Sequence, residues 1–193
     1  MYFYNTGYGS PLSGHIGFPW LKATLNTLAS PPSTAHDDQD IYISFTHREL
    51  PPTVLVAMGL FNNSALTGAN NPNATMPLDR INPHRQWLSS DILPFLTNVA
   101  IERMNCSASY GFANQTTEDP TYYRVLVNQS PQTLPGCFDG PSESCSADGM
   151  REFLRSRGEM FGGFSEACGV EYGNTTDVLG IYARNVNGKA VGR

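Results

Sequence analysis

The residues best suited to chemistry are His47, Arg48 and Glu49, which stand together where an apolar run ends. A histidine can donate a hydrogen bond or carry a positive charge, an arginine binds anions, and a carboxylic acid can transfer a proton. The three residues, called the triplet from here on, could therefore hold an anionic group and protonate a group that leaves it.

The elements on either side of the triplet predict how it is positioned. Ile41, Ile43 and Phe45 alternate with other side chains at the two-residue period of a strand. Pro51 and Pro52 then exclude continued strand pairing and fit the first turn of a helix, which the apolar residues of 53–61 continue. The triplet is expected at a strand–loop–helix junction. In open α/β sheets ligands bind at such junctions, and a helix N-terminus favours anions.

Composition and charge exclude several classes of function. The chain has 193 residues, enough for one domain with a real core, and its hydrophobic content of 40% argues against disorder. The net charge is −5 and the 12 lysines and arginines form no basic run, so no nucleic-acid partner is expected. No apolar stretch approaches the roughly 20 residues that span a bilayer, so no membrane role is expected.

Features of a secreted protein occur without a signal peptide. The start of the chain has neither a basic segment nor an apolar segment of the kind that directs secretion. We therefore expect a secreted, extracellular protein of which this chain is a fragment, its signal peptide lost with a missing N-terminal part. Six Asn-x-Ser/Thr sequons are candidate glycosylation sites: Asn62, Asn73, Asn105, Asn114, Asn128 and Asn174.

The four cysteines, Cys106, Cys137, Cys145 and Cys168, allow three disulfide pairings. Cys137 and Cys145 form the favoured pair because the short loop between them contains a Gly-Pro turn, and closing it would stabilise by roughly 2.5 kcal/mol. A zinc site is the rival interpretation, but no C-x-x-C pair occurs and no histidine stands at ligand spacing. No metal and no cofactor are expected.

The other segments indicate alternation of helices and strands. Residues 92–104 fit either a helix or a strand, because both periods match. The remaining expectations are a helix over 19–29, a long loop over 62–83, a strand over 122–127 paired in an antiparallel way, a helix over 147–157 with Ser146 as its N-cap, and a tail without a convincing element over 174–193.

Four stretches carry a resemblance to a known family. The chain resembles the C-terminal part of a fungal histidine acid phosphatase, the branch that includes phytases, over roughly residues 2–172. The stretches are similar in order and spacing: the opening Tyr4-Asn5-Thr6-Gly7-Tyr8-Gly9-Ser10-Pro11-Leu12, Ser44-Phe45-Thr46-His47 followed by 57–62, Tyr123-Arg124-Val125-Leu126-Val127-Asn128, and Leu134-Pro135-Gly136-Cys137 with Cys145 eight positions on.

The resemblance implies a metal-free phosphomonoesterase that works through a phosphohistidine. The family's nucleophile lies in an Arg-His-Gly-x-Arg-x-Pro motif, and this chain contains no Arg-His-Gly. The nucleophile is therefore expected upstream of Met1, and the fragment is expected to be inactive without it. The implied substrates are small phosphomonoesters, with inositol phosphates among the candidates.

The resemblance also implies a role for each residue of the triplet. His47 matches the second active-site histidine, which donates a hydrogen bond or positive charge to the phosphate. Glu49 matches the proton donor of the His-x-Glu variant, whereas the phytase form has Asp directly after His. Arg48 occupies that position here, and it is expected either to point away or to serve as an extra phosphate ligand.

The implied fold class is α/β, the C-terminal part of an incomplete α/β sandwich with a mixed sheet flanked by helices. Residues 1–172 would form that part of the domain and residues 173–193 a tail or extension. Cys106 and Cys168 would lack the partners that matching cysteines have in the family, a direct Cys106–Cys168 bond being the alternative. The rival functional hypothesis is a catalytically inactive secreted glycoprotein or binding module derived from the same fold.

Overall fold

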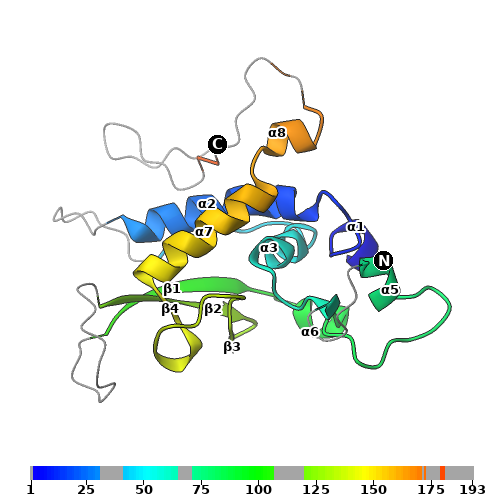
Figure 1. Cartoon of the computed structure of the whole chain (residues 1–193), viewed down its shortest axis with the longest axis horizontal. Coiled ribbons are helices and arrows are strands. Elements are labelled where there is room, and N and C mark those ends of the chain that lie inside the picture. The colour runs from blue at the N-terminus through cyan, green and yellow to red at the C-terminus, as the bar shows by residue number, and fades with distance from the viewer. Residues whose placement is uncertain are drawn as a thin grey trace.

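The computed structural model describes residues 2–30, 41–64, 71–106, 120–170, 172, 179 and 180 (Figure 1). The predicted tail over 174–193 lies outside these residues except for 179 and 180. The helices are α1 (Tyr2–Asn5), α2 (Ser13–Ala29), α3 (Leu50–Met58), α5 (Pro72–Thr75), α6 (Ser89–Ile92), the 3-10 helix η1 (Pro141–Glu143), α7 (Ala147–Phe161) and α8 (Phe164–Ala167). The strands are β1 (Val99–Asn105), β2 (Thr121–Val127), β3 (Ser130–Gln132) and β4 (Cys145–Ser146).

The four strands form one small antiparallel sheet with β2 at its centre. Strand β1 pairs with the whole length of β2, from Val99 opposite Val127 to Asn105 opposite Thr121. Strands β3 and β4 pair with different halves of β2. In Figure 1 the helices α2, α3 and α7 lie above this sheet, which gives two layers of secondary structure.

The helix layer depends on a close crossing of α2 and α3. A Cβ atom added to Gly17 would lie 2.1 Å from the carbonyl oxygen of Thr53, so only glycine permits this approach. Helix α3 is buried on all sides, which its almost wholly apolar sequence predicts. The surrounding core also contains Phe3, Phe18, Leu21, Leu25, Trp87, Ile92, Tyr123, Val125, Met150 and Phe153.

Helix α2 begins earlier than predicted and contains Pro19 in its interior instead of at its start. A proline inside a helix removes one backbone hydrogen bond and costs about 3 kcal/mol. The buried face of the helix outweighs this cost, because Gly14, Gly17, Phe18 and Leu21 pack against neighbouring elements. Tertiary packing therefore places the start of α2 at Ser13, although proline by itself favours the first turn of a helix.

The predicted strand over residues 41–46 is wrong, because the described sheet does not include it. Ile41 is 69% exposed, Ile43 67% and Phe45 95%, so the apolar face expected to be buried is uncovered. Alternating side chains stabilise a strand only when neighbouring strands and a packed face are present, and none of β1–β4 pairs with this segment. Here the segment is tied to α2, where Nε1 of Trp20 donates to Oγ of Ser44 at 3.3 Å.

The predictions for the C-terminal half agree more closely with the structure. Strand β2 and its antiparallel pairing confirm the strand expected over 122–127. The ambiguous stretch 92–104 resolves into the end of α6 and strand β1. In the described part of the predicted loop over 62–83, the short helix α5 interrupts the irregular structure.

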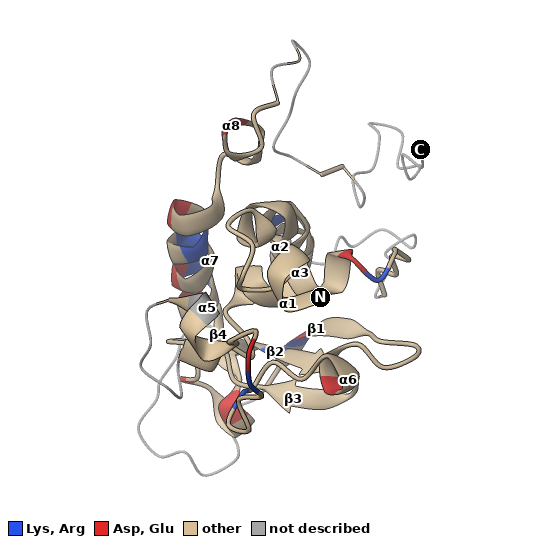
Figure 2. Ribbon diagram, turned by 90° about the vertical axis from the view of Figure 1, so that its right-hand side faces the viewer, with Lys and Arg blue, Asp and Glu red and all other residues tan. Residues whose placement is uncertain are grey.

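Helix α7 confirms the prediction of an N-cap at Ser146, whose Oγ accepts from the backbone N–H of Gly149 at 3.0 Å. Arginines and carboxylates follow one another along the helix (Figure 2), and Arg155 pairs with both Glu152 and Glu159 on the solvent side.

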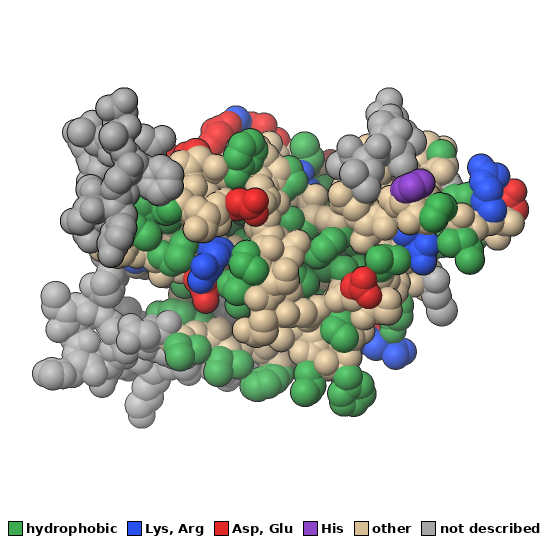
Figure 3. Space-filling view, turned by 90° about the horizontal axis from the view of Figure 1, so that it is seen from below, with side chains coloured by type: hydrophobic (Ala, Val, Ile, Leu, Met, Phe, Trp, Pro, Cys, Tyr) green, Lys and Arg blue, Asp and Glu red, His purple; other side chains and the backbone are tan. Residues whose placement is uncertain are grey.

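The surface of the molecule is not uniformly polar. The face seen from below in Figure 3 exposes hydrophobic side chains between its polar ones. Leu96 is 87% exposed and Phe95 97% exposed in the loop that leads into β1. Among the described helices, none combines the length and the apolar character that crossing a membrane requires.

Candidate active site

The triplet lies immediately before α3, as the prolines predict. The backbone N–H of Leu50 donates to the carbonyl oxygen of His47 at 3.2 Å, and Pro51 and Pro52 have no N–H. The positive end of the helix dipole therefore points toward the triplet, while the first turn has few amide donors for an anion. Side chains must supply those donors, and His47 and Arg48 are the ones nearest in sequence.

The side chain of Arg48 makes two contacts. Its Nε donates to Oε1 of Glu49 at 3.2 Å, and its guanidinium lies 5.6 Å from the centroid of the Tyr2 ring. The side chain of Arg48 is still 76% exposed and that of Glu49 57%. A guanidinium has five donors, so Arg48 retains N–H groups for a phosphate while paired with Glu49.

A groove of about 1400 Å³ opens beside the triplet. Its walls are formed by one face of α2, the segment 41–48, the loop 93–98 and strand β1. His47 and Arg48 line the groove, whereas Glu49 is not among the lining residues. The structure therefore brings two members of the triplet to one surface and pairs the third with Arg48 at its edge.

A second arginine that lines the groove, Arg103, has its side chain committed elsewhere. Its Nη1 donates to the carbonyl oxygens of Leu28 and Ser30 at 3.2 and 3.1 Å, at the end of α2. These are among the helix's terminal carbonyls, which a cation stabilises. Arg103 therefore joins β1 to the end of α2, whereas Arg48 is the groove arginine next to His47 in sequence.

The far end of α3 is held by two side chains that sequence reasoning missed. Arg157 of α7 donates to the carbonyl oxygens of Ala57 and Val56, and Tyr8 donates to that of Leu60 at 2.7 Å. Burial lowers the pKa of Arg157, and burial raises the pKa of Tyr8, an effect that the positive charge of Arg157 opposes. No local sequence signal identifies either contact, because Arg157 lies a hundred residues beyond its acceptors.

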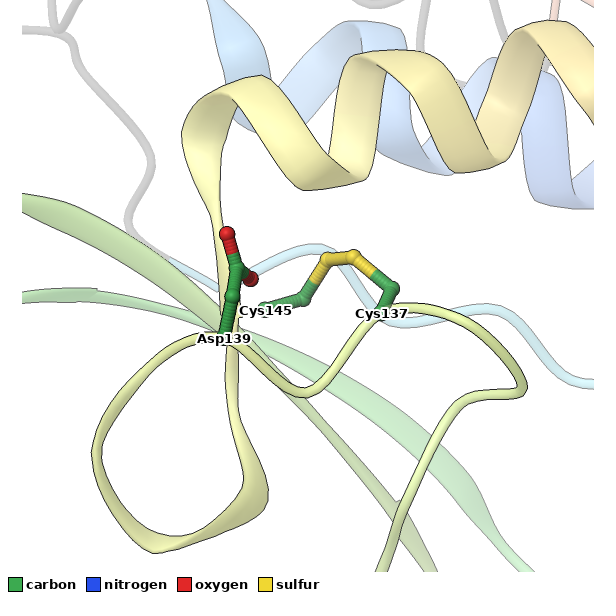
Figure 4. A group of neighbouring side chains, drawn as sticks. All are labelled: Cys137, Asp139 and Cys145. Atoms are coloured by element: carbon green, nitrogen blue, oxygen red, sulfur yellow. A yellow bond between two sulfur atoms is a disulfide. The ribbon is translucent and has the colours of Figure 1, made fainter.

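The expected disulfide between Cys137 and Cys145 is present, with the two Cα atoms 5.1 Å apart (Figure 4). Asp139 lies close to it, but its carboxylate accepts from Oγ of Ser146 at 2.6 Å and from the backbone N–H of Ser146 at 2.9 Å. Partial burial raises the pKa of Asp139, but these hydrogen bonds outweigh burial and hold it below its ordinary value. This cluster orders the start of α7, and its cysteines are consumed by the disulfide.

Cys106 and Cys168 are both half-buried and are not disulfide-bonded. The alternative of a direct bond between them is therefore wrong for this structure, and both thiols stand without the partners that the family resemblance associates with them.

The predicted sequons fall in different settings. Asn105 is exposed at the end of β1, and Oδ1 of Asn62 accepts from the backbone N–H of Ser64 at 3.0 Å. Asn128 lies in the turn that follows β2, and its Nδ2 donates to the carbonyl oxygen of Asp91 at 2.8 Å. Asn73 lies in α5, and Asn114 and Asn174 lie outside the described residues.

Comparison with known proteins identifies the family. The family model described as histidine phosphatase superfamily (branch 2) matches residues 1–128, which include the whole triplet. The chain belongs to this family.

Two curated relatives show how much of a family member the chain represents. It is 30% identical over 171 residues to acid phosphatase PHO1 of Komagataella pastoris, covering 88% of this chain and 32% of that protein. It is 25% identical over 175 residues to phytase A of Aspergillus awamori, covering 81% of this chain and 34% of that protein. The chain spans about a third of the length of the curated relatives that it matches.

A solved structure supports the fold. The phytase from D. castellii matches with a TM-score of 0.68 and 21% sequence identity, covering 94% of this chain and 33% of that one. This likeness confirms the predicted α/β fold class and the predicted relation to part of a phytase fold, although the pairs of the described sheet are all antiparallel and not mixed as predicted.

Proposed function

We propose that this chain supplies the phosphate-binding and proton-donating part of the active site of an acid phosphomonoesterase. The observation that carries the proposal is the position of the triplet. It lies within the residues that match the family, and it stands at the positive end of α3 beside a groove that His47 and Arg48 line.

In the proposed reaction a histidine outside this chain attacks phosphorus through its ring nitrogen, and the bond from phosphorus to the ester oxygen breaks. His47 and Arg48 donate hydrogen bonds to the phosphoryl oxygens, where negative charge must be balanced. Glu49, in its protonated form, gives its proton to the departing alkoxide, and water then releases phosphate from the phosphohistidine.

To act as the proton donor, Glu49 must give up its contact with Arg48 and contact the ester oxygen instead. Its carboxylate accepts from Arg48 in the structure, and because the Glu49 side chain is 57% exposed it is not held there by packing. Arg48 can bind a phosphate through its other N–H groups, and a phosphate that also takes the Nε donor would release the carboxyl group of Glu49 to face the ester oxygen. Arg48 then serves as a phosphate ligand and as the group that holds Glu49 before substrate binds.

The substrates proposed for the intact enzyme are small organic phosphomonoesters, inositol phosphates included. Relatives named as phytases and relatives named as acid phosphatases both match this chain, which supports the common chemistry of phosphate monoesters. The groove offers hydrogen-bond donors for the phosphoryl group in His47 and Arg48, and the reaction itself needs no cofactor.

A chimera tests the proposal. The 171-residue match in the Komagataella pastoris acid phosphatase is replaced by this chain, and hydrolysis of p-nitrophenyl phosphate is measured at acidic pH. We expect turnover that falls at least about a hundredfold in His47→Ala, while Leu78→Ala, at an exposed position outside the groove, keeps the parent rate. A folded chimera that binds phosphate without hydrolysing its esters would instead support the inactive binding module.

A further inference from the structure

Arg48 lies over an aromatic ring at the edge of the groove. Its guanidinium carbon is 5.6 Å from the centroid of the Tyr2 ring, and both residues line the groove beside His47. A cation within about 6 Å of an aromatic ring is attracted by the electron-rich face of that ring. Tyr2 belongs to α1, so a second element contacts the side chain that the proposed reaction uses as a phosphate ligand.

The contact with Tyr2 can hold Arg48 without occupying its hydrogen-bond donors. A guanidinium carries five N–H donors, and the bond to Glu49 uses the one on Nε. The ring face attracts the positive charge of the whole group and requires no particular N–H. The donors on the two terminal nitrogens of Arg48 can therefore bind a phosphate while the ring contact persists.

Helix α1 keeps the Tyr2 ring in a fixed place. Phe3, the next residue, is 2% exposed and lies in the hydrophobic core. The hydroxyl of Tyr4 donates to the carbonyl oxygen of Met76, which ties the other side of this short helix to the loop after α5. The ring therefore belongs to an anchored element, whereas the side chain of Arg48 is 76% exposed and is not held by packing.

We propose that Tyr2 is a positioning residue of the phosphate site and holds Arg48 ready for the phosphoryl group. Immobilising a long, flexible side chain weakens binding, and a side chain that is already held avoids part of this cost. Arg48 is also the residue at which this chain differs from the phytase form of the motif, so this role of Tyr2 is a property of this chain. The inference rests on the proposed function, because it takes Arg48 to be a phosphate ligand.

The test measures the dissociation constant of inorganic phosphate by calorimetry at acidic pH in the Komagataella pastoris chimera. Tyr2→Leu should weaken phosphate binding about three- to tenfold, whereas Tyr2→Phe, which keeps the ring, should weaken it less than about twofold. In a protein that already carries Arg48→Ala, Tyr2→Leu should have no further effect. Tyr2→Met, which also removes the ring, takes the place of Tyr2→Leu if that variant does not fold.

Tyr4→Leu is the matched control, because it removes an aromatic ring from the same helix and its hydroxyl bonds to Met76. It should lower the unfolding temperature and leave the dissociation constant of phosphate at the parent value. Equal weakening in Tyr2→Phe and Tyr2→Leu would assign the effect to the phenol hydroxyl and overturn the proposal. Equal weakening in Tyr4→Leu, or an undiminished effect of Tyr2→Leu beside Arg48→Ala, would assign it to the fold of α1 and also overturn it.

Turnover of p-nitrophenyl phosphate by the same proteins separates this inference from the proposed catalysis. Arg48 would hold the phosphoryl group before the reaction as well as during it, so Tyr2→Leu should raise KM by a larger factor than it lowers kcat. A chimera whose phosphate binding depends on Tyr2 in this way, but which hydrolyses no ester, would contradict the proposed function and leave the role of Tyr2 standing. An active chimera whose phosphate binding ignores Tyr2→Leu would overturn the role of Tyr2 alone.

Discussion

Arg157 of α7 donates from Nε to the carbonyl oxygen of Ala57, which lies in the last turn of α3. Its Nη2 donates to the neighbouring carbonyl oxygen of Val56 at 2.9 Å. Helix α3 therefore has the triplet at its N-terminus and a cationic cap from a distant helix at its C-terminus. These bonds hold α3 in place relative to α7. Because His47 lies directly before α3, they also help to position His47, although they are made at the opposite end of the helix.

Replacing Arg157 by Met should lower the free energy of unfolding by about 1–3 kcal/mol, because two carbonyl oxygens lose their donor in a partly buried place. Arg157→Lys should restore part of the loss. Urea denaturation followed by circular dichroism measures the effect. Arg155→Met is the matched control on the same helix, and since its ion pairs are exposed we expect little change. Equal losses in the two variants would argue against the capping role.

The crossing of α2 and α3 should not tolerate a larger residue at Gly17. Gly17→Ala places a methyl group 2.1 Å from the Thr53 carbonyl oxygen, so the helices must separate, and we expect a loss of about 1–3 kcal/mol. Gly158→Ala is the control in α7, where the nearest atom is the end of the Phe18 ring at 3.2 Å. Thermal unfolding of both variants decides the matter, and a Gly17→Ala protein as stable as the parent would show that the crossing is looser than described.

The contact between Asp139 and Ser146 predicts a dependence of stability on pH. The pKa of Asp139 is lowered on folding from its ordinary value of 3.8, so its contribution is complete above about pH 3.8 and is lost as the pH falls through the folded pKa. The difference in unfolding free energy between parent and Asp139→Asn should be constant at mildly acidic pH and shrink below that value. We expect up to about 1 kcal/mol, allowing for the exposure of this carboxylate. A difference that grows on acidification would have the wrong sign.

The disulfide should contribute to stability through its short loop. Exchange of Cys137 and Cys145 for serine together should cost roughly 2.5 kcal/mol in the chain-entropy model. Cys106→Ser and Cys168→Ser are the controls, since neither cysteine is disulfide-bonded. Denaturation in the presence of a reductant should abolish the difference between the double variant and the parent, and a difference that survives reduction would point to lost packing instead.

Local features of the fold follow from the sequence where their causes lie within a few residues. The N-cap at Ser146, the strand around Tyr123 and the loop closed by Cys137 and Cys145 are of this kind, since side-chain capping, alternation and turn chemistry act over short distances. The position of the triplet before α3 belongs to the same group, because Pro51 and Pro52 mark the helix start.

Features that depend on distant partners could not be predicted. Pro19 lies inside α2 because the helix packs closely at Gly17, and no local rule contains the position of Thr53. The segment around Ile43 alternates as a strand does, yet forming one requires neighbours that the described sheet does not provide. Glu49 is not among the residues that line the groove although it adjoins Arg48, which is, because the direction of a side chain next to a helix start is not set by the local sequence.

The most direct test of the proposed role of this chain compares leaving groups in the Komagataella pastoris chimera. Rates are measured for parent and Glu49→Gln with an alkyl phosphate, whose alkoxide needs a proton, and with p-nitrophenyl phosphate, whose phenolate leaves readily. General acids contribute roughly 10²–10⁴-fold, so kcat/KM should fall at least about a hundredfold for the alkyl ester and much less for the aryl ester. Equal losses on both esters would contradict the assignment of Glu49 as the proton donor.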